Sequence, residues 1–78
     1  EGILPDDLVV VRKQETARNG QTVIALINNE ATIKTYYRKL GRVELHPAND
    51  AMKPIVVKGT DAFKIEGVVT GVIRYCKK

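Results

Sequence analysis

Short apolar stretches separated by turn residues follow one another along this chain, and none of them carries a helical period. Residues 8–11, LVVV, and residues 21–27, QTVIALI, are rich in β-branched side chains, which is typical of strands. Asn28-Asn29 separates the second stretch from a third, residues 30–37. Because asparagine tolerates positive φ better than most residues, this pair predicts a tight hairpin.

The second half of the chain continues in the same way. Residues 43–46 predict a strand that Pro47 ends, residues 55–58 predict another, and a longer one begins at Phe63. The alternation of this last stretch stops at Gly67, where an interior glycine indicates a bulge or a close backbone approach. The pattern as a whole predicts an all-β domain of five or six short, mostly antiparallel strands.

Lys34 lies within EATIKTYYRK, residues 30–39, where alternation defines two faces. Ile33 and Tyr37 share one face, and Lys34 and Tyr36 share the other. The first face also carries Ala31 and Thr35, and the second also carries Glu30, Thr32 and Arg38. Because lysine is seldom fully buried, the pattern alone favours a solvated second face and an ordinary exposed Lys34.

Composition narrows the class of protein. With 78 residues the chain forms one domain at most. The single cysteine, Cys76, cannot form an internal disulfide, and no Cys/His spacing predicts a metal site, so we expect no cofactor. The sequence contains neither an apolar run of about 18 residues nor a secretory leader. We therefore expect a cytoplasmic protein without a membrane partner.

The net charge leaves one binding function open. Thirteen Lys and Arg against nine Asp and Glu give a formal net charge of +4. The basic residues are spread along the chain, and only Arg38, Lys39 and Arg42 form a cluster. One alternative is a small basic β-barrel of the OB type that binds single-stranded nucleic acid. Its sheet face would present Lys34, Tyr36 and Arg38.

No common catalytic pair is complete within these residues. The chain contains no serine, and its single histidine, His46, lies far from the one cysteine in sequence. A nucleophile activated by histidine is therefore not expected. Asp6 and Asp7 follow Pro5 and predict a turn that leads into a strand, instead of acid chemistry.

Three pieces of the sequence resemble the C-terminal catalytic domain of the LexA repressor family. Residues 2–8, GILPDDL, are similar to the family's G-I-L-x-G-D-L, with Asp6 in place of the usual glycine. Residues 30–34, EATIK, are similar to E-x-T-V-K. The third piece comprises VELHPAN at 43–49, KPIVV at 53–57, IEG at 65–67 and GVIR at 71–74. The pieces keep the family's order and extend over nearly the whole chain.

The resemblance implies a fold and a chemistry. The expected fold is a highly twisted sheet or partial barrel of the LexA and signal-peptidase type. Residues 1–78 would be the C-terminal part of a catalytic and dimerisation domain. In this family a serine attacks the chain's own Ala-Gly bond and a lysine of the E-x-T-V-K strand is the general base. The lysine corresponds to Lys34, with Thr32 as a supporting residue, and the serine corresponds to a position before Glu1. We therefore expect the chain alone to lack peptidase activity.

The resemblance also reverses the interpretation of Lys34. A lysine has a pKa of about 10.4 in water and is then protonated at neutral pH. Burial disfavours the charged form and can lower a lysine pKa by about 3–5 units. We therefore predict that Lys34 is the catalytic base and that the upstream segment with the serine covers it.

Partners follow from the same resemblance. Operator DNA would bind to an N-terminal winged-helix domain outside this chain, and RecA filaments on single-stranded DNA would stimulate self-cleavage in the SOS response. The last strand, residues 67–75, is apolar on both faces, and we expect it to form a homodimer as an exposed sheet edge. The predicted interface residues are Val68, Thr70, Val72, Ile73 and Arg74. A second alternative is a UmuD-like subunit of a translesion polymerase, because UmuD shares the first two pieces.

Overall fold

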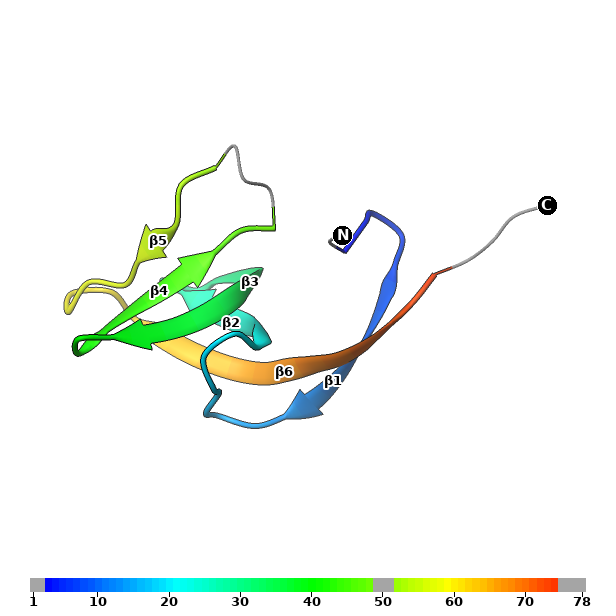
Figure 1. The fold of residues 1–78 in the computed structure, drawn as a ribbon, viewed down its shortest axis with the longest axis horizontal. Helices are drawn as coiled ribbons and strands as arrows, with labels where there is room; N and C mark the ends of the chain where they lie inside the picture. The colour runs from blue at the N-terminus through cyan, green and yellow to red at the C-terminus, as the bar shows by residue number, and fades with distance from the viewer. Residues whose placement is uncertain (1–2, 49–51, 75–78) are drawn as a thin grey trace.

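The structure is a computed structural model that describes residues 3–48 and 52–74, and these residues form one open antiparallel sheet without a helix (Figure 1). In chain order the strands are β1 (Leu8–Lys13), β2 (Thr22–Ile27), β3 (Glu30–Lys39), β4 (Arg42–His46), β5 (Ile55–Val56) and β6 (Phe63–Ile73). Within the sheet they lie in the order β1-β6-β2-β3-β4-β5. The predicted all-β class is confirmed, and the strand predicted at residues 55–58 is shorter than expected.

Two tight hairpins shape the middle of the sheet. Asn28 and Asn29 have φ angles of 51° and 71°, so both central residues of the β2–β3 turn adopt the left-handed region that a primed hairpin turn requires. Leu40 and Gly41 do the same between β3 and β4, with φ angles of 51° and 78°. The hairpin predicted from Asn28-Asn29 is therefore confirmed.

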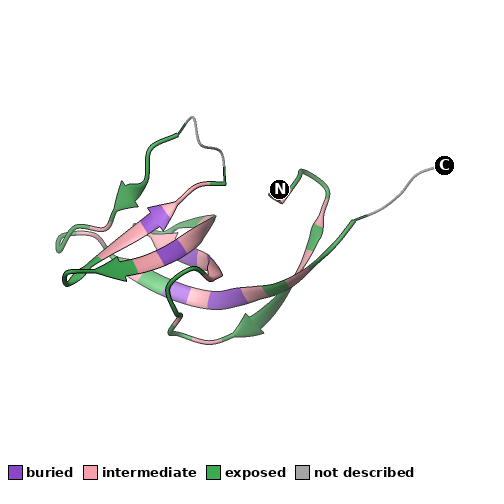
Figure 2. Ribbon diagram, viewed as in Figure 1, coloured by how far each residue is buried: buried purple, intermediate pink, exposed green. Residues whose placement is uncertain are grey.

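The core lies on one face of the central strands (Figure 2). Its buried side chains are Val23, Ala25, Tyr36, Leu45, Ile65 and Val68. Tyr36 is only 6% exposed and lies opposite Leu45 in the register, whereas Ile33 is 38% exposed. The prediction of a solvated Lys34–Tyr36 face is therefore wrong. The physical reason is the apolar area that each face can bury. With the Tyr36 ring packed beside Leu45, more apolar surface is removed from water than if the face with Ile33 and Thr35 were turned toward the core.

The long strand β6 changes partners along its length. Residues 63–68 pair with β2, and residues 67–73 pair with β1. At the crossing, a Cβ added to Gly67 would lie 2.5 Å from Val11 Cγ1 and 2.8 Å from the Arg12 carbonyl oxygen. The register of β6 also shifts against both of its neighbours near this point. The predicted bulge and close backbone approach are both confirmed.

Beyond this crossing, β1 and residues 69–73 of β6 form a two-stranded ribbon, here called the β1–β6 ribbon (Figure 1). Its exposed apolar side chains are Leu8, Val10, Val11, Val72 and Ile73. The strand at this edge of the sheet is β1, and within the predicted stretch 67–75 the prediction of an exposed edge is wrong for Gly67 and Val68, which pair with β1 on one side and with β2 on the other. Residues 69–73, however, pair only with β1 among the described residues. The second edge of this part of β6 is thus open.

Candidate active site

Lys34 lies on the same face of β3 as the core. It is opposite Val23 of β2, and Val23 is in turn opposite Val68 of β6. Directly opposite residues share a face and have Cβ atoms about 5 Å apart, and both valines are buried. The lysine stem therefore lies beside an apolar wall, and Lys34 is half-buried instead of exposed.

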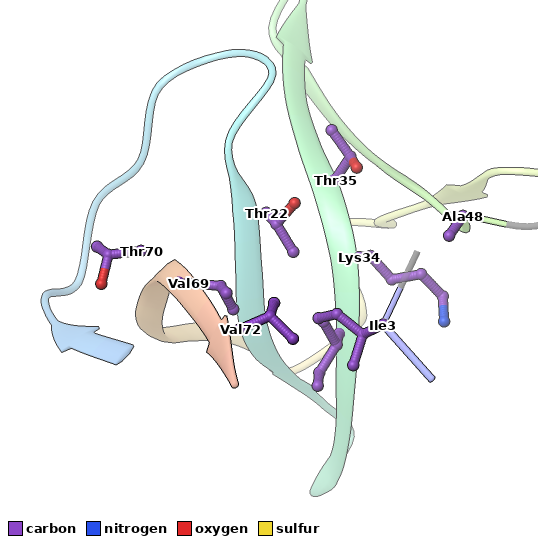
Figure 3. Close-up of a pocket in the computed structure, with 10 residues that line it drawn as sticks. Ile3, Thr22, Lys34, Thr35, Ala48, Val69, Thr70 and Val72 are labelled. Atoms are coloured by element: carbon purple, nitrogen blue, oxygen red, sulfur yellow. The ribbon is translucent and has the colours of Figure 1, made fainter. Parts of the chain in front are cut away.

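A cleft of about 610 Å³ adjoins Lys34 (Figure 3). The N-terminal segment, three strands (β2, β3 and β6) and the residues after β4 contribute to its lining, which comprises Ile3, Thr22, Ile33, Lys34, Thr35, Ala48, Val69, Thr70, Gly71 and Val72. The Lys34 side chain leaves β3 on the side where Ile3 and Ala48 lie. The cleft thus combines one amine with apolar walls and several hydroxyl groups.

Nothing in the described part of the chain pairs with the Lys34 amine. No hydrogen bond or ion pair of this group is found within residues 3–48 and 52–74. Among the described residues the amine is therefore available to a group that enters the cleft.

Thr32 lies two residues before Lys34 on the same face, opposite the buried Ala25. Its side chain is half-buried, and within the described residues its hydroxyl makes no hydrogen bond that would orient the lysine. The supporting role of Thr32 therefore stays a prediction.

Asp7 and Arg74 form an ion pair that the sequence did not indicate. Arg74 Nη2 lies 3.0 Å from Asp7 Oδ2, and the Leu4 amide donates to the same oxygen at 2.8 Å. The Arg74 guanidinium lowers the pKa of the Asp7 carboxyl below its usual value, and the Leu4 amide adds to this effect. The predicted turn at Asp6 and Asp7 is confirmed, and Asp6 has a φ of 72°, where the family usually has glycine.

A second polar cluster lies on the other face of β3 and β4. His46 Nε2 is 3.0 Å from Glu44 Oε1, and Arg42 Nη2 is 3.1 Å from Glu44 Oε2. The hydrogen bond with His46, followed by that with Arg42, lowers the pKa of Glu44. Tyr37 packs edge-on against His46, with ring centroids 4.7 Å apart. His46 is thus a strand-end residue in a surface network.

The structure also bears on the nucleic-acid alternative. That interpretation needs aromatic and basic side chains together on an accessible sheet face. Tyr36, which would stack on bases, is part of the core, so Lys34, Tyr36 and Arg38 do not form such a surface.

The predicted interface residues separate into two groups. Val68 is buried in the core and is not accessible to a partner. Thr70, Val72, Ile73 and Arg74 are exposed on the β1–β6 ribbon or directly after it. Tyr75 and Cys76 lie outside the described residues.

Comparison with known proteins identifies the family. The family model described as Peptidase S24-like matches residues 1–70. The chain belongs to this family. A peptidase-type domain agrees with the presence of an amine, that of Lys34, at a cleft. Separately, the described ranges contain no helix that could span a membrane.

Relatives of this Peptidase S24-like chain include several LexA repressors, so the predicted resemblance to that family is confirmed. The protein from Syntrophotalea carbinolica is 61% identical over 75 residues, which is 96% of this chain and 37% of the relative. The protein from Ruminiclostridium cellulolyticum is 52% identical over 73 residues, 94% of this chain and 33% of the relative. The Bordetella pertussis protein is 48% identical over 73 residues, 94% of this chain and 34% of the relative. The chain thus spans about a third of the length of these curated relatives.

Proposed function

We propose that this chain is the C-terminal part of the self-cleavage and dimerisation domain of a LexA-like repressor of the SOS response. One observation carries the proposal: Lys34, the lysine of EATIK, stands half-buried beside Val23 at a cleft of a Peptidase S24-like domain. An amine in this position has the properties of a general base.

The chemistry would be that of a serine-lysine pair. The neutral Lys34 Nζ accepts the proton of a serine hydroxyl that precedes this chain in the intact protein, and the serine oxygen attacks the carbonyl carbon of the Ala-Gly bond. The protonated lysine then gives its proton to the leaving glycine amine. The lysine, neutral again, then takes a proton from water as the water oxygen attacks the ester carbonyl, and it returns that proton to the departing serine oxygen.

The cleft geometry supports this assignment. Ile3, the first described residue, lines the same cleft as Lys34, which is where a serine a few positions earlier in the intact protein would need to be close. Apolar residues Ile33, Val69 and Val72 provide a surface for an extended segment.

We further propose that the β1–β6 ribbon forms the homodimer contact. Val72 and Ile73 are 43% and 53% exposed, and the open edge at residues 69–73 leaves backbone groups for pairing with a second copy. A two-fold axis would let the same residues, Thr70 to Arg74, meet their counterparts. Two linked operator-binding domains then gain from effective concentration, and RecA-stimulated cleavage removes that gain.

The test uses the intact protein. Replacement of Lys34 by alanine should abolish self-cleavage at alkaline pH, because no base remains, while operator binding and dimerisation persist. Lys64→Ala is the matched control, since Lys64 is an exposed lysine on β6 whose nearest carboxylate oxygen is 3.8 Å away. Cleavage products are quantified by mass spectrometry. Cleavage at the normal rate in the Lys34→Ala variant would contradict the proposal.

Operator binding by the same protein separates the two family functions. A repressor binds its operator before cleavage and loses affinity afterwards, whereas a UmuD-like polymerase subunit has no operator to bind.

A further inference from the structure

The turn before β1, residues 4–7, has few contacts that would hold it in place. We call this segment the entry turn. Leu4 is 53% exposed, and both Pro5 and Asp6 are exposed. The turn closes through a hydrogen bond of 3.1 Å from the Asp7 amide to the Leu4 carbonyl. Its third residue, Asp6, adopts a left-handed φ of 72° that glycine would adopt more easily. Neither apolar packing nor local preference therefore fixes the position of the turn.

The Asp7 carboxylate ties the entry turn to the far end of the chain. Its side chain is only 3% exposed, and its two oxygens accept three hydrogen bonds from Arg74. Nε lies 3.1 Å from Oδ1 and 3.3 Å from Oδ2, and Nη2 lies 3.0 Å from Oδ2. The Leu4 amide donates to Oδ2 as well, at 2.8 Å. Such bidentate, charge-assisted contacts fix orientation as well as distance. Because Arg74 follows β6 directly, the turn is held against the end of that strand.

Both ends of this connection lead to the cleft at Lys34. Ile3 directly precedes the entry turn and lines the cleft, and β6 contributes Val69 and Val72 to its wall (Figure 3). The ion pair thus fixes where the chain meets the cleft relative to the strand that forms the cleft wall.

We propose that the Asp7–Arg74 ion pair is a positioning element of self-cleavage, which holds the entry turn on β6 so that the polypeptide before Ile3 meets Lys34 in register. The inference rests on the proposed function, because it places the nucleophile in that preceding segment. Neither Asp7 nor Arg74 touches the reacting groups. A general base must lie within hydrogen-bond reach of the hydroxyl it deprotonates, and a misplacement of about 1 Å can cost about 100-fold in rate.

The experiment compares self-cleavage of the intact protein with that of its Asp7→Asn variant over a range of alkaline pH. Asparagine keeps the size of Asp7 and an acceptor for the Leu4 amide, but it loses the charge that pairs with Arg74. We expect the rate to fall by about tenfold or more at every pH, because the geometry is relaxed. The pH at which the rate is half-maximal should stay the same, because the surroundings of Lys34 are unchanged.

Two further variants make the test specific. Glu66→Gln removes the exposed Lys64–Glu66 ion pair on the same strand and should leave the rate unchanged. Arg74→Gln should lose at least as much as Asp7→Asn, and the double variant should lose no more than Arg74→Gln alone, because both changes break the same contact. Circular dichroism verifies that each variant is folded, and the exposed position of Arg74 makes its variant the one least prone to misfold.

Three results would overturn the inference: a wild-type rate in a folded Asp7→Asn or Arg74→Gln variant, a shift of the half-maximal pH, or losses that multiply in the double variant. Failure of the proposed function looks different, because Lys34→Ala would then still cleave. If Lys34→Ala is inactive and Asp7→Asn is fully active, only the positioning role is wrong.

Discussion

The two halves of β6 use the same kind of sequence for different purposes. Residues 63–68 pair with β2, a strand in the interior of the sheet, and contribute Ile65 and Val68 to the core. Residues 69–73 have β1 on one side only and leave Val72 and Ile73 exposed. Valine and isoleucine are therefore not sufficient to tell a core segment from an interaction surface. The identity of the neighbouring strand decides which of the two a β-branched stretch becomes: β2 carries the buried Val23 and Ala25, whereas β1 carries exposed apolar side chains.

The same comparison separates stability from function. The core of the central strands, to which residues 63–68 of β6 belong together with Leu45 and Tyr36, supplies the burial that stabilises the fold. The β1–β6 ribbon supplies little of it, but it forms one wall of the cleft at Lys34 and carries the proposed dimer contact. Substitutions in the two regions should therefore differ in what they change.

The largest expected effect is a loss of stability from a substitution in the core of the central strands. Leu45 is fully buried, and Leu45→Ala should lower the free energy of unfolding by about 2–5 kcal/mol because it removes apolar contacts and leaves a cavity. Leu8→Ala in the β1–β6 ribbon is the matched control, with an expected loss below about 1 kcal/mol, since Leu8 is 52% exposed. Urea unfolding followed by circular dichroism measures both. Equal losses would show that the ribbon is as well packed as the core.

A smaller effect is expected where the two regions meet. Gly67→Ala would place a Cβ 2.5 Å from Val11 Cγ1 and 2.8 Å from the Arg12 carbonyl oxygen. Backbone must shift to accept it, so we expect a loss of about 1–3 kcal/mol in the free energy of unfolding. Gly59→Ala, with no atom within 4 Å of the added Cβ, is the control and should change stability little. If Gly67→Ala left the free energy of unfolding unchanged, β1 would not cross β6 as closely as the structure indicates.

The smallest effect depends on pH. Asp61 accepts hydrogen bonds from the Lys58 amide at 2.8 Å and from Asn28 Nδ2 at 3.1 Å, and these contacts lower its pKa below the ordinary 3.8. A carboxyl whose folded pKa is lowered stabilises the fold above its unfolded pKa and loses this contribution as pH falls through the folded value. Part of the stability lost below about pH 4 should therefore be absent from the Asp61→Asn variant. Urea midpoints measured as a function of pH test this; parallel curves for the two proteins would exclude a role for Asp61.

The sequence predicted the local features well. Asn28-Asn29 and Gly67 carry their own conformational signals, and the structure places a hairpin and a close crossing there. The core face of β3 was not predictable from alternation, because Ile33 and Tyr36 are both large and apolar. Only the pairing of Tyr36 with Leu45 decides between them.

Long-range pairing is where sequence patterns carried no information. Nothing in the apolar run of β6 indicates that β1 covers one of its edges, and nothing links Asp7 to Arg74, which are 67 positions apart. Lys34 was singled out through the EATIK resemblance and not through its pattern, which favoured an exposed lysine. Its half-buried position beside Val23 follows from the strand register, which requires the fold.

The central claim is that Lys34 is the general base of self-cleavage, and the rate of spontaneous cleavage of the intact protein as a function of pH tests it most directly. A lysine base accepts a proton only in its neutral form, so the rate should rise about tenfold per pH unit from neutral pH and then level off once the amine is neutral. The Lys64→Ala control should follow the same curve. A rate that stays constant between neutral and alkaline pH would contradict the assignment of Lys34.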